Sequence, residues 1–168
     1  MVNLVSKIIS GGQTGAERAG LDVALWHQFP HGGWCPKGRK AEDGTVGGQY
    51  QLTETPSASY LQRTEWNVRD SDGTIVFTFA EDITGGSLRT LAFAKKHQKP
   101  CLHISRSIYQ PEVLIQNFIA EHSIRVLNIA GSRESKEVGI HDWVKRLLDD
   151  ALFWSESHPV MLGGPDEG

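Results

Sequence analysis

Cysteine is scarce in this chain of 168 residues, and its scarcity excludes several kinds of site. The two cysteines, Cys35 and Cys101, lie far apart and match neither a zinc-binding nor a redox spacing. The seven histidines are scattered and form no H-E-x-x-H motif. We therefore expect no disulfide framework and no metal held by protein ligands. No G-x-S-x-G motif or Ser/His/Asp order is present either.

Long apolar runs and excess positive charge are also missing. No segment approaches the roughly 18 consecutive apolar residues of a membrane-spanning helix, and the first residues lack the basic-then-apolar pattern of a signal peptide. The formal net charge of -3 argues against general affinity for nucleic-acid backbones, which requires a basic face. These features predict a cytoplasmic protein that binds neither membrane nor nucleic acid.

Hydrophobic periodicity instead indicates strands and helices in alternation. The expected strands cover 4–10, 32–35, 49–55, 73–79, 101–105 and 124–131. The expected helices cover 15–29, 57–68, 85–98, 111–122 and 139–154. This order predicts an α/β fold: one Rossmann-like, doubly wound domain over 1–154, with a mostly parallel sheet of about six strands. Residues 155–168 are polar and contain Pro and Gly, which predicts a flexible C-terminal tail.

The turn after the first expected strand, "SGGQTG", has the composition of an anion-binding loop. In the dinucleotide fingerprint G-x-G-x-x-G its three key positions read Ser, Gly and Gly, and no Walker Lys follows. A tight strand-to-helix turn that needs glycine only for its geometry is the alternative. The candidate phosphate-binding residues are Ser10, Gly11, Gly12, Gln13, Thr14 and Gly15.

A second glycine-rich turn, "TGGS", follows the strongest expected strand. Thr84 is a typical helix N-cap, and capping alone would explain it. Capping does not explain two glycines in the first helical turn, where each costs about 1 kcal/mol relative to Ala. The candidate binding residues are Thr84, Gly85, Gly86 and Ser87. In a doubly wound sheet of order 3-2-1-4-5-6, strands 4–10 and 73–79 would be neighbours, so both turns would face one crevice.

Cationic side chains near these turns could supply charge to an anion. Lys37 and Arg39 lie in the loop "GWCPKGRKAEDG", although a solvated loop is equally consistent with its composition. Arg133 follows the last strand at the correct end of the sheet, where it could clamp a phosphate or carboxylate. The same cations could lower the pKa of Cys35, but a structural cysteine is the favoured interpretation.

The segment "RTEWNVRDSDGT" precedes the strongest strand and contains turn-forming residues. Asp72 lies at the amino end of the strand, away from the expected crevice, and is interpreted as a turn residue. Arg63 and Asn67 recur at near-helical spacing, and either a structural or a binding role is open for them.

Together, "ISGGQTGAERAGLD", "GWCPKGRKAEDG", "RTEWNVRDSDGT" and "TGGS" resemble the putative molybdenum carrier family. This family belongs to a wider set of Rossmann-like nucleotide-binding proteins that also holds the LOG "lysine decarboxylase-like" phosphoribohydrolases and DprA. The resemblance covers about residues 8–154. It implies an anion site at the two glycine-rich turns, a phosphorylated molybdopterin-type molybdenum cofactor as cargo, and self-association as a dimer or tetramer.

The phosphoribohydrolase branch provides the alternative function, a nucleotide N-glycosidic hydrolase. Its members carry a P-G-G-x-G-T-x-x-E motif, whereas this chain reads "TGGSLRTLA", with Leu91 or Ala92 at the Glu position. Glu17 is the one nearby carboxylate that could substitute, although favourable placement at a helix N-terminus also explains it. The sequence therefore favours a carrier of a small phosphorylated ligand over an enzyme.

Overall fold

The computed structural model of the chain describes residues 4–154, so the expected tail at 155–168 lies outside the described residues. The helices are α1 (Ala16–Trp26), α2 (Tyr60–Arg69), α3 (Gly85–Lys96), α4 (Pro111–Glu121) and α5 (Ile140–Leu152). The main sheet contains β1 (Lys7–Ile9), β2 (His31–Gly32), β7 (Gly73–Phe77), β8 (Cys101–Ile104) and β9 (Val126–Gly131). Four short strands lie outside it: β3 (Trp34–Cys35), β4 (Lys40–Ala41), β5 (Gly44–Thr45) and β6 (Thr53–Glu54).

The five strands of the main sheet are all parallel, in the order β2-β1-β9-β7-β8. The last strand in the chain, β9, lies at the centre, with Leu127 opposite Ile8 on one side and Ile129 opposite Ile75 on the other. The expectation that strands 4–10 and 73–79 are neighbours is therefore wrong. If β9 is counted as the first strand, followed by β1, β2, β7 and β8, the sheet has the doubly wound order 3-2-1-4-5. The β9-α5 unit therefore takes the place of the first strand–helix unit of such a fold.

The main sheet has five strands, close to the predicted six, because residues 33–55 do not extend it. β2 ends at Gly32, and β3 pairs in parallel with β6 in a separate two-stranded sheet. Gly33 has φ +126, a conformation that favours glycine, and a Cβ there would collide with the Ser10 carbonyl. The side-chain amide of Asn67 then bonds both the N–H and the carbonyl of Trp34 at 2.8 and 2.9 Å. Asn67 thus has a structural role.

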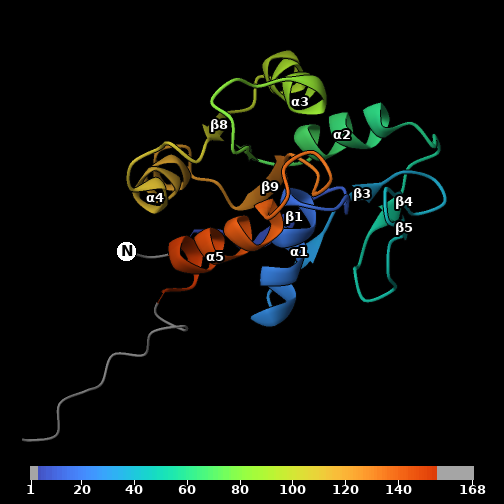
Figure 1. Cartoon of the computed structure of the whole chain (residues 1–168), viewed down its shortest axis with the longest axis horizontal. Coiled ribbons are helices and arrows are strands. Elements are labelled where there is room, and N and C mark those ends of the chain that lie inside the picture. Colours follow the sequence, from blue (N-terminus) through green and yellow to red (C-terminus); the bar gives the residue numbers. More distant parts are fainter. Residues whose placement is uncertain (1–3, 155–168) are drawn as a thin grey trace, which may run out of the picture.

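Helices cover both faces of the sheet, as the strand–helix alternation predicts (Figure 1). α1, α4 and α5 pack on one face, where side chains such as Phe77, Leu127 and Ile129 are fully buried. α2 and α3 cover the other face, toward which the alternate residues of β9 point. Those residues, Asn128 and Ala130, are small or polar, so the space between the sheet and these two helices is left partly open.

Turn residues at the amino ends of the strands have the structural roles that the sequence suggests. The carboxylate of Asp72 accepts hydrogen bonds from the backbone N–H groups of Arg125 and Val126 at 3.1 and 2.8 Å. It thereby holds the start of β9 against the start of β7, and the predicted turn role of Asp72 is confirmed.

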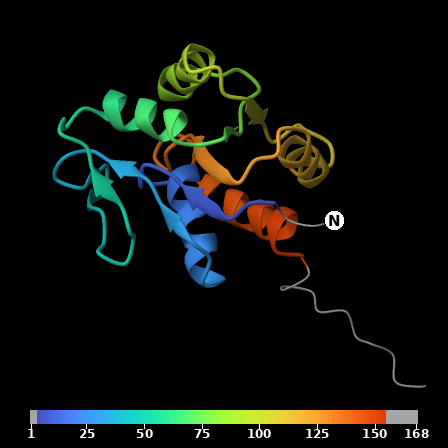
Figure 2. The same ribbon diagram turned by 180° about the vertical axis from the view of Figure 1, so that it is seen from behind.

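Residues 33–57 form an arm that extends from the sheet beside α1 (Figure 2). Arg39 holds this arm together, because its guanidinium donates to the carbonyl oxygens of Val46, Gly47, Tyr50 and Leu52. Arg39 therefore has a structural role within the arm.

A partly buried network of hydrogen bonds connects the arm to α1 and α5. The carboxylate of Asp22 accepts hydrogen bonds from Tyr50 and His141, both at 2.6 Å. The hydrogen bond to Asp22, joined by one to Asp142, raises the pKa of His141. Burial, together with the bond to Asp22, raises the pKa of Tyr50 to about 12.

The network makes stability depend on pH. Because the pKa of His141 is raised on folding, its contribution is complete below the ordinary value of 6.5 and is lost as pH rises through the folded value. We expect His141→Gln to reduce the free energy of unfolding by on the order of 1 kcal/mol at about pH 6 and by clearly less at about pH 9. Urea unfolding of both proteins at the two pH values measures this. An equal loss at both values would contradict it.

Candidate functional site

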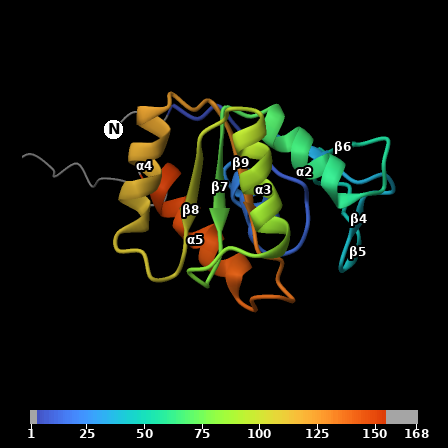
Figure 3. The ribbon, with the colours of Figure 1, turned by 90° about the horizontal axis from the view of Figure 1, so that it is seen from above.

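A cleft of about 620 Å³ opens at the carboxyl ends of β7 and β9, between the sheet and helices α2 and α3. This is the point where the winding of the sheet reverses, which is where doubly wound folds bind ligands. Figure 3 shows that the loops following β7 and β9 lie at the same edge of the molecule, beside the start of α3. Both glycine-rich turns contribute to the cleft: the first through Gln13, the second through Gly85, Gly86 and Ser87.

The charge of the cleft is opposite in sign to that of the chain. Among the described residues, its lining contains one carboxylate, that of Glu17. The cationic residues in the lining are Lys40, Arg63, Arg89, Arg133 and Lys136. With an overall net charge of -3, such a concentration of positive charge in a concave site favours an anionic ligand.

The start of α3 presents backbone donors to this cleft. Among the described residues, no acceptor bonds the N–H groups of Gly85, Gly86 or Ser87, as expected in the first turn of a helix. Thr84 stands at the N-cap, but its hydroxyl does not cap the helix and instead accepts a 2.8 Å bond from Lys136. A Cβ at Gly86 would meet nothing within 4 Å, so the space beside these donors is open.

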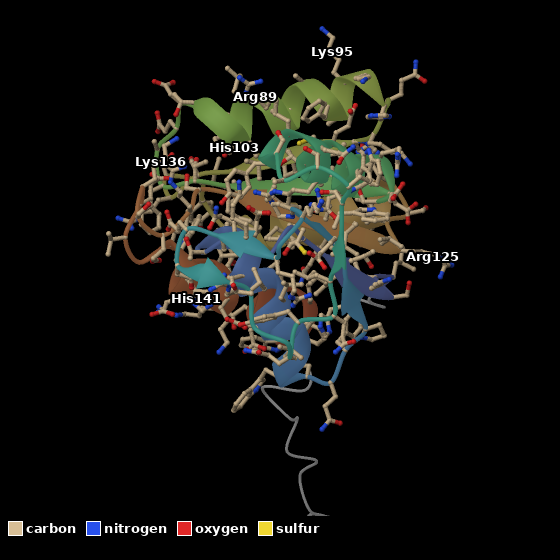
Figure 4. The ribbon with its side chains drawn as sticks, turned by 90° about the vertical axis from the view of Figure 1, so that its right-hand side faces the viewer. Arg89, Lys95, His103, Arg125, Lys136 and His141 are labelled. Carbon is tan, nitrogen blue, oxygen red and sulfur yellow. The ribbon has the colours of Figure 1, made fainter. Side chains whose placement is uncertain are left out.

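Arg89 and Lys136 place positive charge near the same helix end. Figure 4 shows Arg89 on α3 at the top of the view and Lys136 at the left, both away from Arg125 at the right. Since the helix dipole adds partial positive charge there, this end of the cleft combines two kinds of attraction for an anion.

The first turn, residues 10–15, uses much of its backbone internally. The Gly11 N–H donates to the Glu17 carboxylate at 3.0 Å, and the Thr14 N–H donates to the Gln13 side chain at 3.0 Å. The hydroxyl of Ser10 is buried and donates to the Glu17 carbonyl. These groups therefore organise the turn. Gln13 is its residue in the cleft lining, and Glu17 lines the cleft from the first turn of α1.

Two glycines of this turn are required by backbone geometry. Gly12 and Gly15 have φ values of +79 and +81, which favour glycine. A Cβ at Gly12 would contact Leu52, and one at Gly15 would collide with the backbone of Ser132. Both directions lead into protein, so the glycines permit close packing of the turn against its neighbours.

Glu17 and Arg63 form a buried ion pair in the wall of the cleft. Their side chains are 10% and 8% exposed, and Arg63 Nη1 donates to Glu17 Oε1. Gly11 is necessary for this contact, because a Cβ there would overlap the guanidinium. Arg63 Nε is buried and has no hydrogen-bond partner within the described part of the chain. The sequence left the role of Arg63 open, and the structure places it in the cleft.

Tyr60 provides an aromatic surface beside this pair. The Arg63 guanidinium lies 5.3 Å from the centre of the Tyr60 ring, and Lys40 Nζ lies 4.7 Å from it. Sequence reasoning did not select Tyr60, Lys40, Arg89 or Lys136. Lys40 stands one residue after Arg39, and only the fold distinguishes the cation that reaches the cleft from the one that holds the arm.

The cationic loop candidates lie outside the cleft. Lys37 is exposed on the arm and does not line it, and Arg39 is engaged with arm carbonyls. Cys35 is buried in β3, and burial raises the pKa of its thiol by more than the neighbouring cations lower it, so the suggested net lowering is wrong. The favoured structural interpretation of Cys35 agrees with this environment.

Arg133 lies in the lining and is tied to the tip of the arm. It forms a 3.4 Å ion pair with Glu42, whose carboxylate also accepts bonds from Ser135 and from the Thr14 hydroxyl. Burial would raise the pKa of Glu42, but the hydrogen bonds from Ser135 and Thr14 hold it below its ordinary value. Glu42 thus connects the turn at residues 10–15 with the loop after β9.

Within residues 4–154, no group of three or more His, Cys, Asp or Glu side chains is placed to hold a metal ion. No helix in that range is long and apolar enough to cross a membrane.

Two comparisons with known proteins identify relatives of the chain. Residues 8–152 match the model of the circularly permutated YpsA SLOG family. The fold is similar to the 1.45 Å crystal structure of a protein from Syntrophus aciditrophicus SB described as a putative molybdenum carrier protein. The two chains are 48% identical with a TM-score of 0.86, over 89% of this chain and 96% of the other. A search of curated proteins finds no significant match.

The Glu17–Arg63 pair yields a test of the site's energetics. Removing one partner of a buried pair leaves the other charge uncompensated, so Glu17→Leu should lower the free energy of unfolding by about 3 kcal/mol or more. Adding Arg63→Met should recover part of that loss, because the stranded charge is gone. Urea unfolding of the two variants and the parent measures the coupling. Additive losses would show that the two charges do not stabilise each other.

Proposed function

We propose, from the premise that the chain belongs to the circularly permutated YpsA SLOG family, that it is a carrier of a phosphorylated, nucleotide-like ligand. The observation that carries the proposal is the cleft at the sheet's switch point, where five cationic side chains, one carboxylate and a free helix start converge. Phosphate is the ligand group that such helix starts bind most commonly.

The phosphate is assigned to the start of α3. Gly85, Gly86 and Ser87 offer N–H donors there, and Gly86 leaves room for the ligand to approach the backbone. Arg89 and Lys136 supply neutralising charge, and Arg133 extends it across the loop after β9. In this proposal, residues 10–15 form part of the wall of the cleft and hold the side chains of Gln13 and Glu17 in place.

A molybdopterin-type molybdenum cofactor is the cargo that we propose, because the solved relative is described as a molybdenum carrier. Such a cofactor brings its metal already bound to a pterin that carries a phosphate. It therefore needs phosphate and ring contacts from the protein rather than metal ligands. The cleft's volume of about 620 Å³ lies within the usual range for small-molecule sites. The homo-oligomer and the cytoplasmic location expected from the sequence remain predictions.

The phosphate assignment predicts the effect of substitutions in the cleft. Gly86→Val fills the open space beside the α3 donors and should reduce binding of nucleoside monophosphates, measured by isothermal titration calorimetry, by at least about tenfold. Arg89→Ala should reduce it by a smaller factor that shrinks further at high salt.

Gly48→Val and Lys37→Ala are the matched controls. Gly48 also has open space at its Cβ position, and Lys37 is also an exposed cation, but neither lines the cleft. Both should bind like the parent protein. If Gly86→Val binds normally, the ligand's phosphate does not sit at the start of α3.

A hydrolase that cleaves the N-glycosidic bond of nucleotides is the second candidate, and one observation favours it. Glu17 is the cleft's carboxylate, as such chemistry would require, whereas Leu91 and Ala92 do not line the cleft. Against it, Glu17 Oε1 is engaged by Gly11 and Arg63.

Incubation with nucleoside monophosphates and chromatography for free base separates the two candidates. The carrier proposal predicts release no faster than in buffer alone. Steady release that Glu17→Gln abolishes would replace the carrier by the hydrolase. A catalytically inert protein that binds the same monophosphates would leave the carrier as the function.

A further inference from the structure

Arg63 Nε is a hydrogen-bond donor that the protein leaves unused in the wall of its cleft. Arg63 is 7% exposed, and Nε has no partner within the described residues. Buried donors are satisfied in the great majority of native structures, so an unsatisfied one requires an explanation, and an acceptor supplied from outside the protein is one. Arg63 also lines the cleft, so this unsatisfied donor lies in the wall beside the space that a ligand would occupy.

Glu17 presents an unused acceptor in the same wall. Its Oε1 accepts from Gly11 and Arg63, while Oε2 accepts no hydrogen bond from the described residues. Since Glu17 also lines the cleft, one ionised oxygen remains for the ligand. A guanidinium donor and a carboxylate acceptor therefore stand side by side, held together by their own ion pair.

Building on the proposed phosphate site, we propose that Glu17 and Arg63 recognise the 2-amino-4-oxo-pyrimidine edge that guanine and pterins share. This edge carries a ring carbonyl, a ring N–H and an amino group in a row. The Arg63 N–H donates to the carbonyl, and the Glu17 carboxylate accepts from the N–H and amino groups. The Tyr60 ring, against which Arg63 lies, offers a face on which the heterocycle stacks.

The arrangement discriminates against adenine. Adenine has an amino group where guanine has its carbonyl, and its neighbouring ring nitrogen is an acceptor rather than a donor. Bound in the same orientation, it would set a donor against Arg63 and an acceptor against Glu17. A site whose buried polar groups lose their partners in this way rejects the wrong ligand strongly.

The first test is a titration series on the unaltered protein with GMP, IMP, AMP, neopterin monophosphate and inorganic phosphate. GMP should bind on the order of tenfold more tightly than IMP, which lacks the amino group, and at least about 100-fold more tightly than AMP. Neopterin monophosphate carries the same edge as GMP, so it should also bind more tightly than AMP. Whichever of GMP and neopterin monophosphate binds more tightly identifies the natural source of the edge.

Glu17→Gln supplies the second test, with Glu121→Gln as control because Glu121 is an exposed carboxylate at the end of α4, outside the lining. Glu17→Gln should reduce the GMP-to-AMP ratio by about tenfold or more while inorganic phosphate binds as before. Glu121→Gln should leave the ratio unchanged. The ligand series needs no variant, so it stands even if Glu17→Gln unfolds.

The outcomes distinguish a failure of this inference from a failure of the proposed function on which it rests. If all monophosphates bind alike, or AMP binds most tightly, the edge recognition is wrong and the phosphate site stands. If neither the monophosphates nor inorganic phosphate bind, the proposed function falls together with the inference.

Discussion

The pairing of β9 with both β1 and β7 is the constraint on which the rest of the structure depends. Each neighbour is hydrogen-bonded to β9 along its length, and they do not contact each other in the sheet. At the end of β9, Gly131 has φ +143, and a Cβ there would collide with the carbonyl of Phe77. This close approach brings the loops after β7 and β9 to one edge and so forms the cleft.

The charge around the cleft is opposite in sign to the net charge of the molecule. The chain carries an excess of acidic residues, yet those near the cleft are mostly engaged by the protein itself. Glu42 is bound by Ser135 and Arg133, and the carboxylate of Glu137 accepts from the backbone of Phe79 and Ala80. Arg89 and Lys136 line the cleft. A ligand therefore meets a positive field that the overall composition conceals.

The fold was predictable because its elements depend on local patterns. Buried β-branched runs such as 73–77 and the amphipathic α5 can be identified from periodicity alone. The five helices of residues 4–154 lie within their expected ranges, apart from one residue, Arg69, at the end of α2. Strand order was less accessible. Alternation of elements is the same whether the β9-α5 unit stands first or last in the chain, so the sequence could not show that β9 separates β1 from β7.

The candidate site was only partly accessible for a related reason. The glycines of "TGGS" signal a bare helix start, and this local feature survives in the fold. The roles of the individual cationic residues, in contrast, are not determined by the local sequence. Arg39, Lys40 and Arg63 are equally plausible from composition, and their roles depend on partners up to 46 positions away, as in the pair of Arg63 with Glu17. Glu17 was noted for its helix position, but its partner could not be inferred.

The central position of β9 also shapes how the chain must fold. Without residues 126–131, the β1–β2 pair and the β7–β8 pair have no strand to join them, and each would leave open the edge that β9 occupies. Loop closure over more than a hundred residues, from Lys7 to Val126, then has to precede the contacts that reward it. During synthesis from the N-terminus the sheet is thus completed last at its middle, and the exposed inner edges must avoid other chains until that step.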